Sequence, residues 1–125
     1  MHLIVTGLNH KTAPLEVREK FAFSTMQVRD IYRELKNCSC IDGAVLLVTC
    51  NRTELYAAAK DISEGFAVLE NMLEVHAGIA RCAFNASLYR YSHHQTVAHL
   101  FTVAAGLDSM ILGEQEILGQ IKEAY

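Results

Sequence analysis

Residues 44–60 decide the fold, and they read AVLLVTCNRTELYAAAK. The first part, Ala44–Cys50, is a continuous apolar run rich in Val and Leu, which predicts a buried central strand. The second part, Thr53–Lys60, predicts its hairpin partner. The connection, Asn51-Arg52, is short and begins with a residue that favours turns, although it is not the preferred Asn-Gly pair. The rest of the chain is expected to be arranged around this antiparallel pair.

Upstream of the hairpin, the sequence predicts one strand and two helices. Leu3–Leu8 is short and apolar and is followed by a loop that ends at Pro14, which is typical of a buried strand. Leu15–Phe21 predicts a short helix. Ser24 and Gln27 have the spacing of a capping box, which opens a longer helix. The apolar face of that helix consists of Val28, Ile31, Tyr32 and Leu35.

Downstream of the hairpin, the pattern changes to a long helix and then a strand. Asp61 is a suitable N-cap with Glu64 three residues on, and Gly78 is a suitable C-cap. One stripe of this helix carries Phe66, Leu69, Leu73 and His76. Ser87–Tyr91 predicts an edge strand.

Two more helices are predicted at the C-terminal end. Ser92 with Gln95 forms another capping-box pattern and opens a helix to about Ala105. A last helix begins near Glu114 and continues to Tyr125. The six elements before them match the split βαβ, or ferredoxin-like, order (βαββαβ). We therefore expect a single α+β domain with a four-stranded antiparallel sheet, helices on one face and extra C-terminal helices.

Composition indicates an ordinary globular protein of 125 residues, 51% hydrophobic and 20% charged. No apolar stretch approaches the roughly 18 to 20 residues of a membrane span, so no membrane association is expected. The N-terminus has neither a basic region nor a cleavage-site pattern, and we expect a cytoplasmic location.

Charge and cysteine spacing exclude several classes of site. The net charge is −3, with +2 up to Lys60 and −5 beyond it, which argues against RNA binding by phosphate contacts alone. Cys38-x-Cys40 is too tight for usual zinc spacing, so no metal is predicted and the thiols should be free. The chain has no G-x-G-x-x-G and no G-x-x-x-x-G-K-[ST], and hence no visible means of holding a nucleotide cofactor.

Cys50 is a candidate nucleophile because it lies at the end of a predicted strand, where sites tend to be built. Arg52 offers a fixed positive charge two residues on, and a nearby cation favours the reactive thiolate. The alternative is a small core residue, since free Cys is among the most buried types.

His99 is a second candidate, on the predicted helix that ends near Ala105. It falls about 160° from the centre of the stripe formed by Val97, Leu100, Phe101 and Ala104, at 100° per residue. It is thus available to face a cleft, although an exposed or merely hydrogen-bonded histidine fits equally.

A polar set surrounds the start of the last predicted helix. Glu116 and Gln120 are four residues apart and share a face. Acidic residues at this place usually complement the helix dipole. The members are Ser109, Glu114, Gln115, Glu116 and Gln120.

Three stretches together resemble one known family. They are GLNHKTAP (7–14), TCNRTELY (49–56), and HLF (99–101) continued by AAGLDSMILGEQEILGQ (104–120). In this order and spacing they are similar to the N-terminal catalytic domain of the glutamyl-tRNA reductases. That family makes glutamate-1-semialdehyde, the first committed intermediate of a tetrapyrrole (porphyrin, heme) pathway, from glutamyl-tRNA and NADPH.

The resemblance implies a role for each candidate. Cys50 stands at the nucleophile, which would form a thioester, and His99 at a position needed for activity. The substrate-binding positions correspond to Thr49, Cys50, Asn51, Arg52, Ser109, Glu114, Gln115, Glu116 and Gln120.

The resemblance also implies partners and parts outside this chain. It implies an NADPH-binding domain and a helical dimerisation domain, both absent from residues 1–125. Further implied partners are glutamyl-tRNA, a second copy in a homodimer, and contact with the downstream aminomutase. Two alternatives remain: a non-catalytic module that recognises the tRNA end, and a regulatory interaction domain.

Overall fold

A computed structural model describes residues 1–106. Four strands, five α-helices and two 3₁₀ turns are assigned within this range. In chain order they are β1 His2–Asn9, α1 Leu15–Arg18, η1 Glu19–Phe21, α2 Thr25–Lys36, β2 Ile41–Val48, β3 Arg52–Ala59, α3 Ile62–Ala77, α4 Arg81–Phe84, η2 Asn85–Ser87, β4 Tyr89–Ser92 and α5 His94–Ala104.

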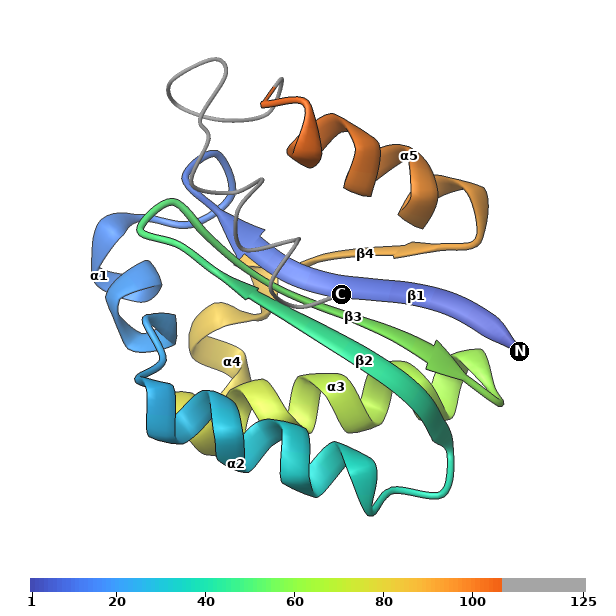
Figure 1. Ribbon diagram of the computed structural model, residues 1–125. Helices are drawn as coiled ribbons and strands as arrows, with labels where there is room; N and C mark the ends of the chain where they lie inside the picture. The colour runs from blue at the N-terminus through green and yellow to red at the C-terminus, as the bar shows by residue number, and fades with distance from the viewer. Residues whose placement is uncertain (107–125) are drawn as a thin grey trace.

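The strands form one sheet in the order β2-β3-β1-β4, with all neighbouring pairs antiparallel (Figure 1). This confirms the predicted four-stranded antiparallel sheet and the ferredoxin-like order. The registers place Gly7 of β1 opposite both Glu54 of β3 and Tyr89 of β4.

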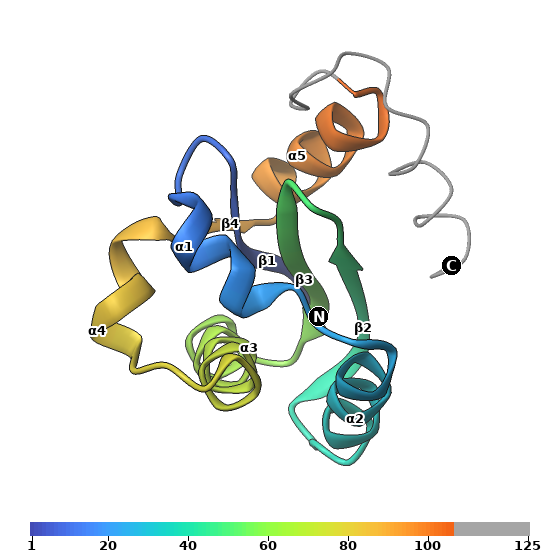
Figure 2. The ribbon, with the colours of Figure 1, turned by 90° about the vertical axis from the view of Figure 1, so that its left-hand side faces the viewer.

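Helices cover both faces of the sheet rather than one. Figures 1 and 2 show α2 and α3 under one face and α5 over the other, which we call the outer face. The main apolar core lies between the sheet and the helices α2 and α3, and it includes Ile4, Phe21, Leu55 and Leu69. The first of the extra C-terminal helices therefore creates a second, separate layer against the sheet. No helix in the described range is long and apolar enough to span a bilayer.

Three of the predicted helix ends are confirmed. Ser24 and Gln27 form the reciprocal hydrogen bonds of a capping box. Asp61 accepts a hydrogen bond from the Glu64 backbone, and Gly78 ends α3 with a φ of 73°. Short local signals suffice here because both partners of each cap lie within a few residues.

The predicted cap at Ser92 is wrong. Ser92 is the last residue of β4, and α5 is preceded by His93, which has a φ of 53° and makes no side-chain cap hydrogen bond. Pairing with Ile4 of β1 keeps Ser92 in the sheet, so it does not act as a cap. The edge strand is accordingly shifted, because Ser87 lies in η2 rather than in β4.

The central hairpin is also shifted from the prediction. β2 begins at Ile41 and ends at Val48, so Thr49 and Cys50 lie beyond the strand. β3 begins at Arg52, so the connection consists of residues 49–51 instead of Asn51-Arg52. The apolar run did not locate the end of β2, because Thr49 belongs to the turn. Its hydroxyl accepts hydrogen bonds from backbone N–H groups of the turn.

Candidate active site

The turn between β2 and β3 carries Cys50 at its tip. The backbone N–H of Thr49 donates to the Arg52 carbonyl at 2.8 Å and closes the hairpin over Cys50 and Asn51. The Thr49 hydroxyl accepts from the backbone N–H groups of Asn51 (3.1 Å) and Arg52 (3.2 Å). The Cys50 thiol is free and exposed. Local hydrogen bonds therefore hold the turn while its cysteine stays accessible.

A second loop is tied to the Cys50 turn. Asn9 Oδ1 accepts from the backbone N–H groups of Lys11 (2.9 Å) and Thr12 (3.1 Å), which shapes the chain after β1. Arg18 of α1 then donates from Nη1 to the Cys50 carbonyl at 3.3 Å. Arg18 thus places a guanidinium beside the backbone of the candidate nucleophile.

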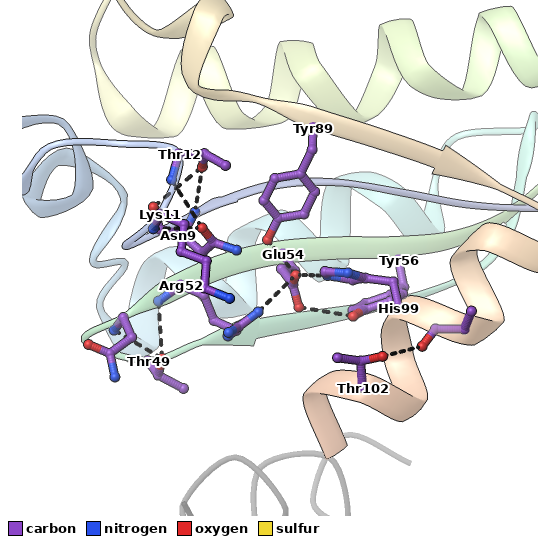
Figure 3. Close-up of polar contacts among 12 residues, drawn as sticks. Asn9, Lys11, Thr12, Thr49, Arg52, Glu54, Tyr56, Tyr89, His99 and Thr102 are labelled. Carbon is purple, nitrogen blue, oxygen red and sulfur yellow. Dashed lines mark hydrogen bonds and ion pairs between the residues drawn. The ribbon is translucent and has the colours of Figure 1, made fainter. Parts of the chain in front are cut away.

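Alternation along β3 points Arg52, Glu54 and Tyr56 toward the outer face. Glu54 is fully buried. Its Oε1 accepts from the Tyr56 hydroxyl at 2.9 Å, and its Oε2 accepts from Arg52 Nη1 at 3.4 Å (Figure 3). The carboxylate therefore has two donors from its own strand.

Two further donors reach Glu54 from elsewhere in the chain. The Tyr89 hydroxyl of β4 donates to Oε2 at 2.5 Å, and Nε2 of His99 from α5 contacts the same oxygen (Figure 3). Gly7 makes this possible, because a Cβ there would lie 2.9 Å from Cγ of Glu54. We call Glu54 and its partners Arg52, Tyr56, Tyr89 and His99 the Glu54 cluster.

Electrostatics within the cluster favour a charged carboxylate. Burial by itself would raise the pKa of Glu54, but the hydrogen bond and charge of His99, with help from Tyr89 and Arg52, hold it below its ordinary value. Burial, followed by the nearby charge of Glu54, raises the pKa of Tyr89. Glu54 is therefore an anion surrounded by neutral and cationic donors at neutral pH.

The helix α5 turns an unexpected side to the sheet. Thr96, His99 and Val103 face inward, whereas Val97 is 40% and Phe101 70% exposed. The apolar stripe predicted from the sequence is thus not the buried seam. The outer face of the sheet presents polar partners to α5, namely Glu54 for His99 and the Leu3 carbonyl for Thr96. These hydrogen bonds favour the orientation of α5 in which His99 faces the sheet.

The structure brings some predicted site residues together and leaves others outside its range. Arg52 and His99 meet at Glu54. Thr49, Cys50 and Asn51 share the turn that leads directly into β3. The polar set Ser109, Glu114, Gln115, Glu116 and Gln120 lies outside the described residues.

Sequence reasoning missed Glu54, Tyr56, Tyr89 and Arg18. A period of two through Arg52, Glu54 and Tyr56 was available as a signal that three polar side chains share one face. Nothing local marks Tyr89 or Arg18, because their partners lie 35 and 32 residues away. Within residues 1–106, no group of three or more His, Cys, Asp or Glu side chains is placed to hold a metal ion.

Comparisons with known proteins agree on one family. The model of the glutamyl-tRNAGlu reductase N-terminal domain matches residues 6–125. Proteins named glutamyl-tRNA reductase from Carboxydothermus hydrogenoformans and Pelotomaculum thermopropionicum are 48% and 46% identical over the whole chain. The solved structure of the glutamyl-tRNA reductase from Methanopyrus kandleri superposes with a TM-score of 0.71 at 36% identity and covers 98% of this chain.

This chain spans only part of those proteins. It covers 28% of the two bacterial relatives and 27% of the solved chain. The match to the domain model nevertheless covers nearly all of the sequence, including the hairpin with Cys50 and the helix with His99. The chain therefore belongs to the glutamyl-tRNA reductase family, as its N-terminal domain.

Proposed function

We propose that this domain transfers the glutamyl group of glutamyl-tRNA to Cys50, as the first half of the glutamyl-tRNA reductase reaction. The observation that carries the proposal is the position of Cys50. Its free, exposed thiol lies at the tip of a hairpin whose next strand leads directly into the buried Glu54 cluster. A thiol that precedes a set of proton donors and acceptors by only a few residues of chain is suited to acyl transfer.

The reaction on this domain balances as an exchange of an oxygen ester for a thioester. The Cys50 sulfur attacks the ester carbonyl carbon, and the thiol proton passes to His99. When the tetrahedral intermediate collapses, the bond between carbonyl carbon and ribose oxygen breaks and its electron pair leaves with that oxygen. His99 returns the proton to the oxygen, which gives free tRNA and an acylated cysteine.

Recognition of glutamate is assigned to the residues around the turn and to the polar set. Arg52 is suited to a forked contact with the side-chain carboxylate of the substrate. Thr49 and Asn51 flank the nucleophile. The remaining contacts, including those of acidic side chains with the substrate ammonium group, are assigned to Ser109, Glu114, Gln115, Glu116 and Gln120.

NADPH does not fit the described part of this chain. The sheet of residues 1–106 is wholly antiparallel and has no parallel βαβ unit with a glycine-rich turn, which dinucleotide-binding folds use for the pyrophosphate. The hydride for reduction to glutamate-1-semialdehyde is therefore assigned to a cofactor held outside this chain. The homodimer and the aminomutase contact belong equally to the longer protein, whose location we propose to be cytoplasmic.

The alternative is a module that only recognises the tRNA end or a regulatory partner, with Cys50 as a passive surface residue. Acylation distinguishes the two. The chain is incubated with glutamyl-tRNA without NADPH, quenched in acid, and digested for mass spectrometry. We expect a glutamyl adduct on the Cys50 peptide, and slow release of free glutamate as water cleaves the thioester.

Matched variants make this test specific. Cys50→Ser should lose the adduct and reduce deacylation to background, whereas Cys82→Ser, at another exposed cysteine, should keep both. Deacylation that persists in Cys50→Ser would reject Cys50 as the nucleophile. Aldehyde formed by this chain with NADPH would instead reject the assignment of the cofactor to another domain.

A further inference from the structure

Glu54 is the residue on which the two described halves of the site converge. It contacts Arg52, a candidate for glutamate recognition, and His99, the candidate for proton transfer, through the same oxygen (Figure 3). The side chain is fully buried and lies in a strand, so its position is set by the sheet. A buried carboxylate with this arrangement can hold the ring of His99 in one orientation.

The contact with His99 occurs at one particular ring nitrogen. An ionised carboxylate only accepts hydrogen bonds, so the ring nitrogen that faces it, Nε2, must carry the proton. The ring itself lies against Tyr89 and Tyr91, with centroid separations of 5.1 and 5.0 Å. In residues 1–106, the hydrogen bond of this ring is made at Nε2, and none engages Nδ1. Nδ1 is consequently the nitrogen left to exchange protons.

The neighbours of Glu54 strengthen this assignment. From β3 they are Arg52 and Tyr56, and from β4 Tyr89; all three donate to the carboxylate. A phenolic oxygen can also accept a hydrogen bond, but the Nε2 contact of His99 is with the Glu54 carboxylate and not with either tyrosine. The lowered pKa of the Glu54 carboxyl keeps it ionised, and so unable to donate to the ring, at neutral pH.

We propose that Glu54 is a positioning residue that holds the proton of His99 on Nε2, so that Nδ1 receives the Cys50 thiol proton and returns it to the tRNA oxygen. The part that concerns Nδ1 chemistry rests on the proposed function. The part that concerns the tautomer rests on the contact alone. A carboxylate in this role does not react; its loss lets the imidazole adopt either tautomer.

The tautomer is measured directly by nitrogen NMR of the chain labelled at histidine, above about pH 8.5, where an ordinary imidazole is neutral. In the wild type we expect the proton on Nε2 of His99. In Glu54→Gln the amide can donate to the ring, so we expect a shift toward the Nδ1–H form. A wild-type ring with its proton on Nδ1, or the same tautomer in both proteins, overturns the proposal. The wild-type result decides even if the variant does not fold.

The kinetic test uses a double-mutant cycle on the rate of Cys50 acylation. Glu54→Gln should lower the rate constant about 100-fold, with little change in the tRNA concentration that gives half the maximal rate. In a His99→Ala background the same change should cost less than about threefold, because its effect passes through His99. Additive losses in the cycle would mean that Glu54 does not act through His99.

Glu70→Gln is the matched control, since Glu70 is another buried glutamate with several donors but lies in α3, on the opposite side of the sheet from the Glu54 cluster. It should leave the acylation rate unchanged once the folded fraction is equal. The outcomes also separate the two proposals. Absence of any Cys50 adduct in the wild type rejects the proposed function, while the NMR measurement still decides the tautomer.

Discussion

Glu54 on the outer face of the sheet and Glu70 of α3, on the opposite side, are both buried carboxylates, but their donors differ. Glu70 of α3 accepts from Arg90 at 2.5 and 2.9 Å, from Arg81 at 3.2 Å and from Thr6 at 3.4 Å. Its two arginines reach solvent and join α3 to α4 and β4. Glu54 instead accepts from phenols and an imidazole besides one buried arginine.

The difference shows that burial of a charge does not identify a functional site. Any buried carboxylate needs donors, because an unpaired one would cost several kcal/mol. Arginine donors satisfy this need but cannot serve as an acid or a base, since a guanidinium stays protonated near neutral pH. The imidazole of His99 has a second nitrogen that can take part in chemistry. The type of donor, rather than the buried carboxylate itself, therefore indicates a functional site.

The largest contrast is expected in thiol labelling, between the buried Cys40 and the exposed Cys50. The hydrogen bond with Cys38, whose Sγ is 3.1 Å away, and then burial raise the pKa of Cys40 to about 11 from 9.0. We expect Cys40 to react with iodoacetamide about 100-fold more slowly than an ordinary thiol near neutral pH. Cys50 should be labelled first, because it is exposed and Arg18 contacts its carbonyl. Adducts are mapped by mass spectrometry, with urea-unfolded protein as the control; preferential labelling of Cys38, Cys40 or Cys82 contradicts the prediction.

Matched arginine substitutions should separate recognition from stability. Arg52→Lys keeps the charge but loses the planar fork, so kcat/KM in a full-length enzyme should fall about 10- to 100-fold. Arg81→Lys, at a partner of Glu70, should leave kcat/KM within about twofold because Arg81 lies in α4 and pairs with glutamates of α3 rather than with the Glu54 cluster. Steady-state kinetics check both, and equal effects of the two variants would remove Arg52 from recognition.

Loss of charge at Glu70 should appear in stability instead. Glu70→Gln removes the ionic part of its hydrogen bonds to Arg81 and Arg90, which are 35% and 38% exposed and remain solvated. The free energy of unfolding should therefore fall by only about 1–2 kcal/mol, as measured in urea. A larger loss would show that the two arginines depend on Glu70 more than their exposure indicates.

Acid should produce the smallest change, and its sign follows from Glu54. Since the pKa of Glu54 is lower in the folded chain than its ordinary 4.5, its contribution to stability is present above that value. The contribution is lost as the pH falls from about 4.5 through the lower, folded pKa. Urea unfolding at a series of pH values should therefore give a steeper acid decline for wild type than for Glu54→Gln; parallel curves would contradict the prediction.

Much of the fold followed from local patterns. The apolar run before Cys50, the capping box at Ser24 and the glycine after α3 each predicted an element that is present. The exceptions are instructive. Ser92 has the spacing of a cap but pairs with β1, and α5 buries His99 instead of its apolar stripe.

The sequence by itself determined the order of strands and helices, the antiparallel sheet and, through its resemblance to one family, the candidates Cys50 and His99. Periodicity and caps involve residues within one or two turns of each other, so they can be recognised from the sequence alone. Only the tertiary structure decided that Arg52, Tyr89 and His99 share Glu54. Two of those contacts join residues 35 and 45 positions apart, and which faces meet depends on packing of the whole sheet. Buried polar groups select such partners because a carboxylate without donors would destabilise the fold.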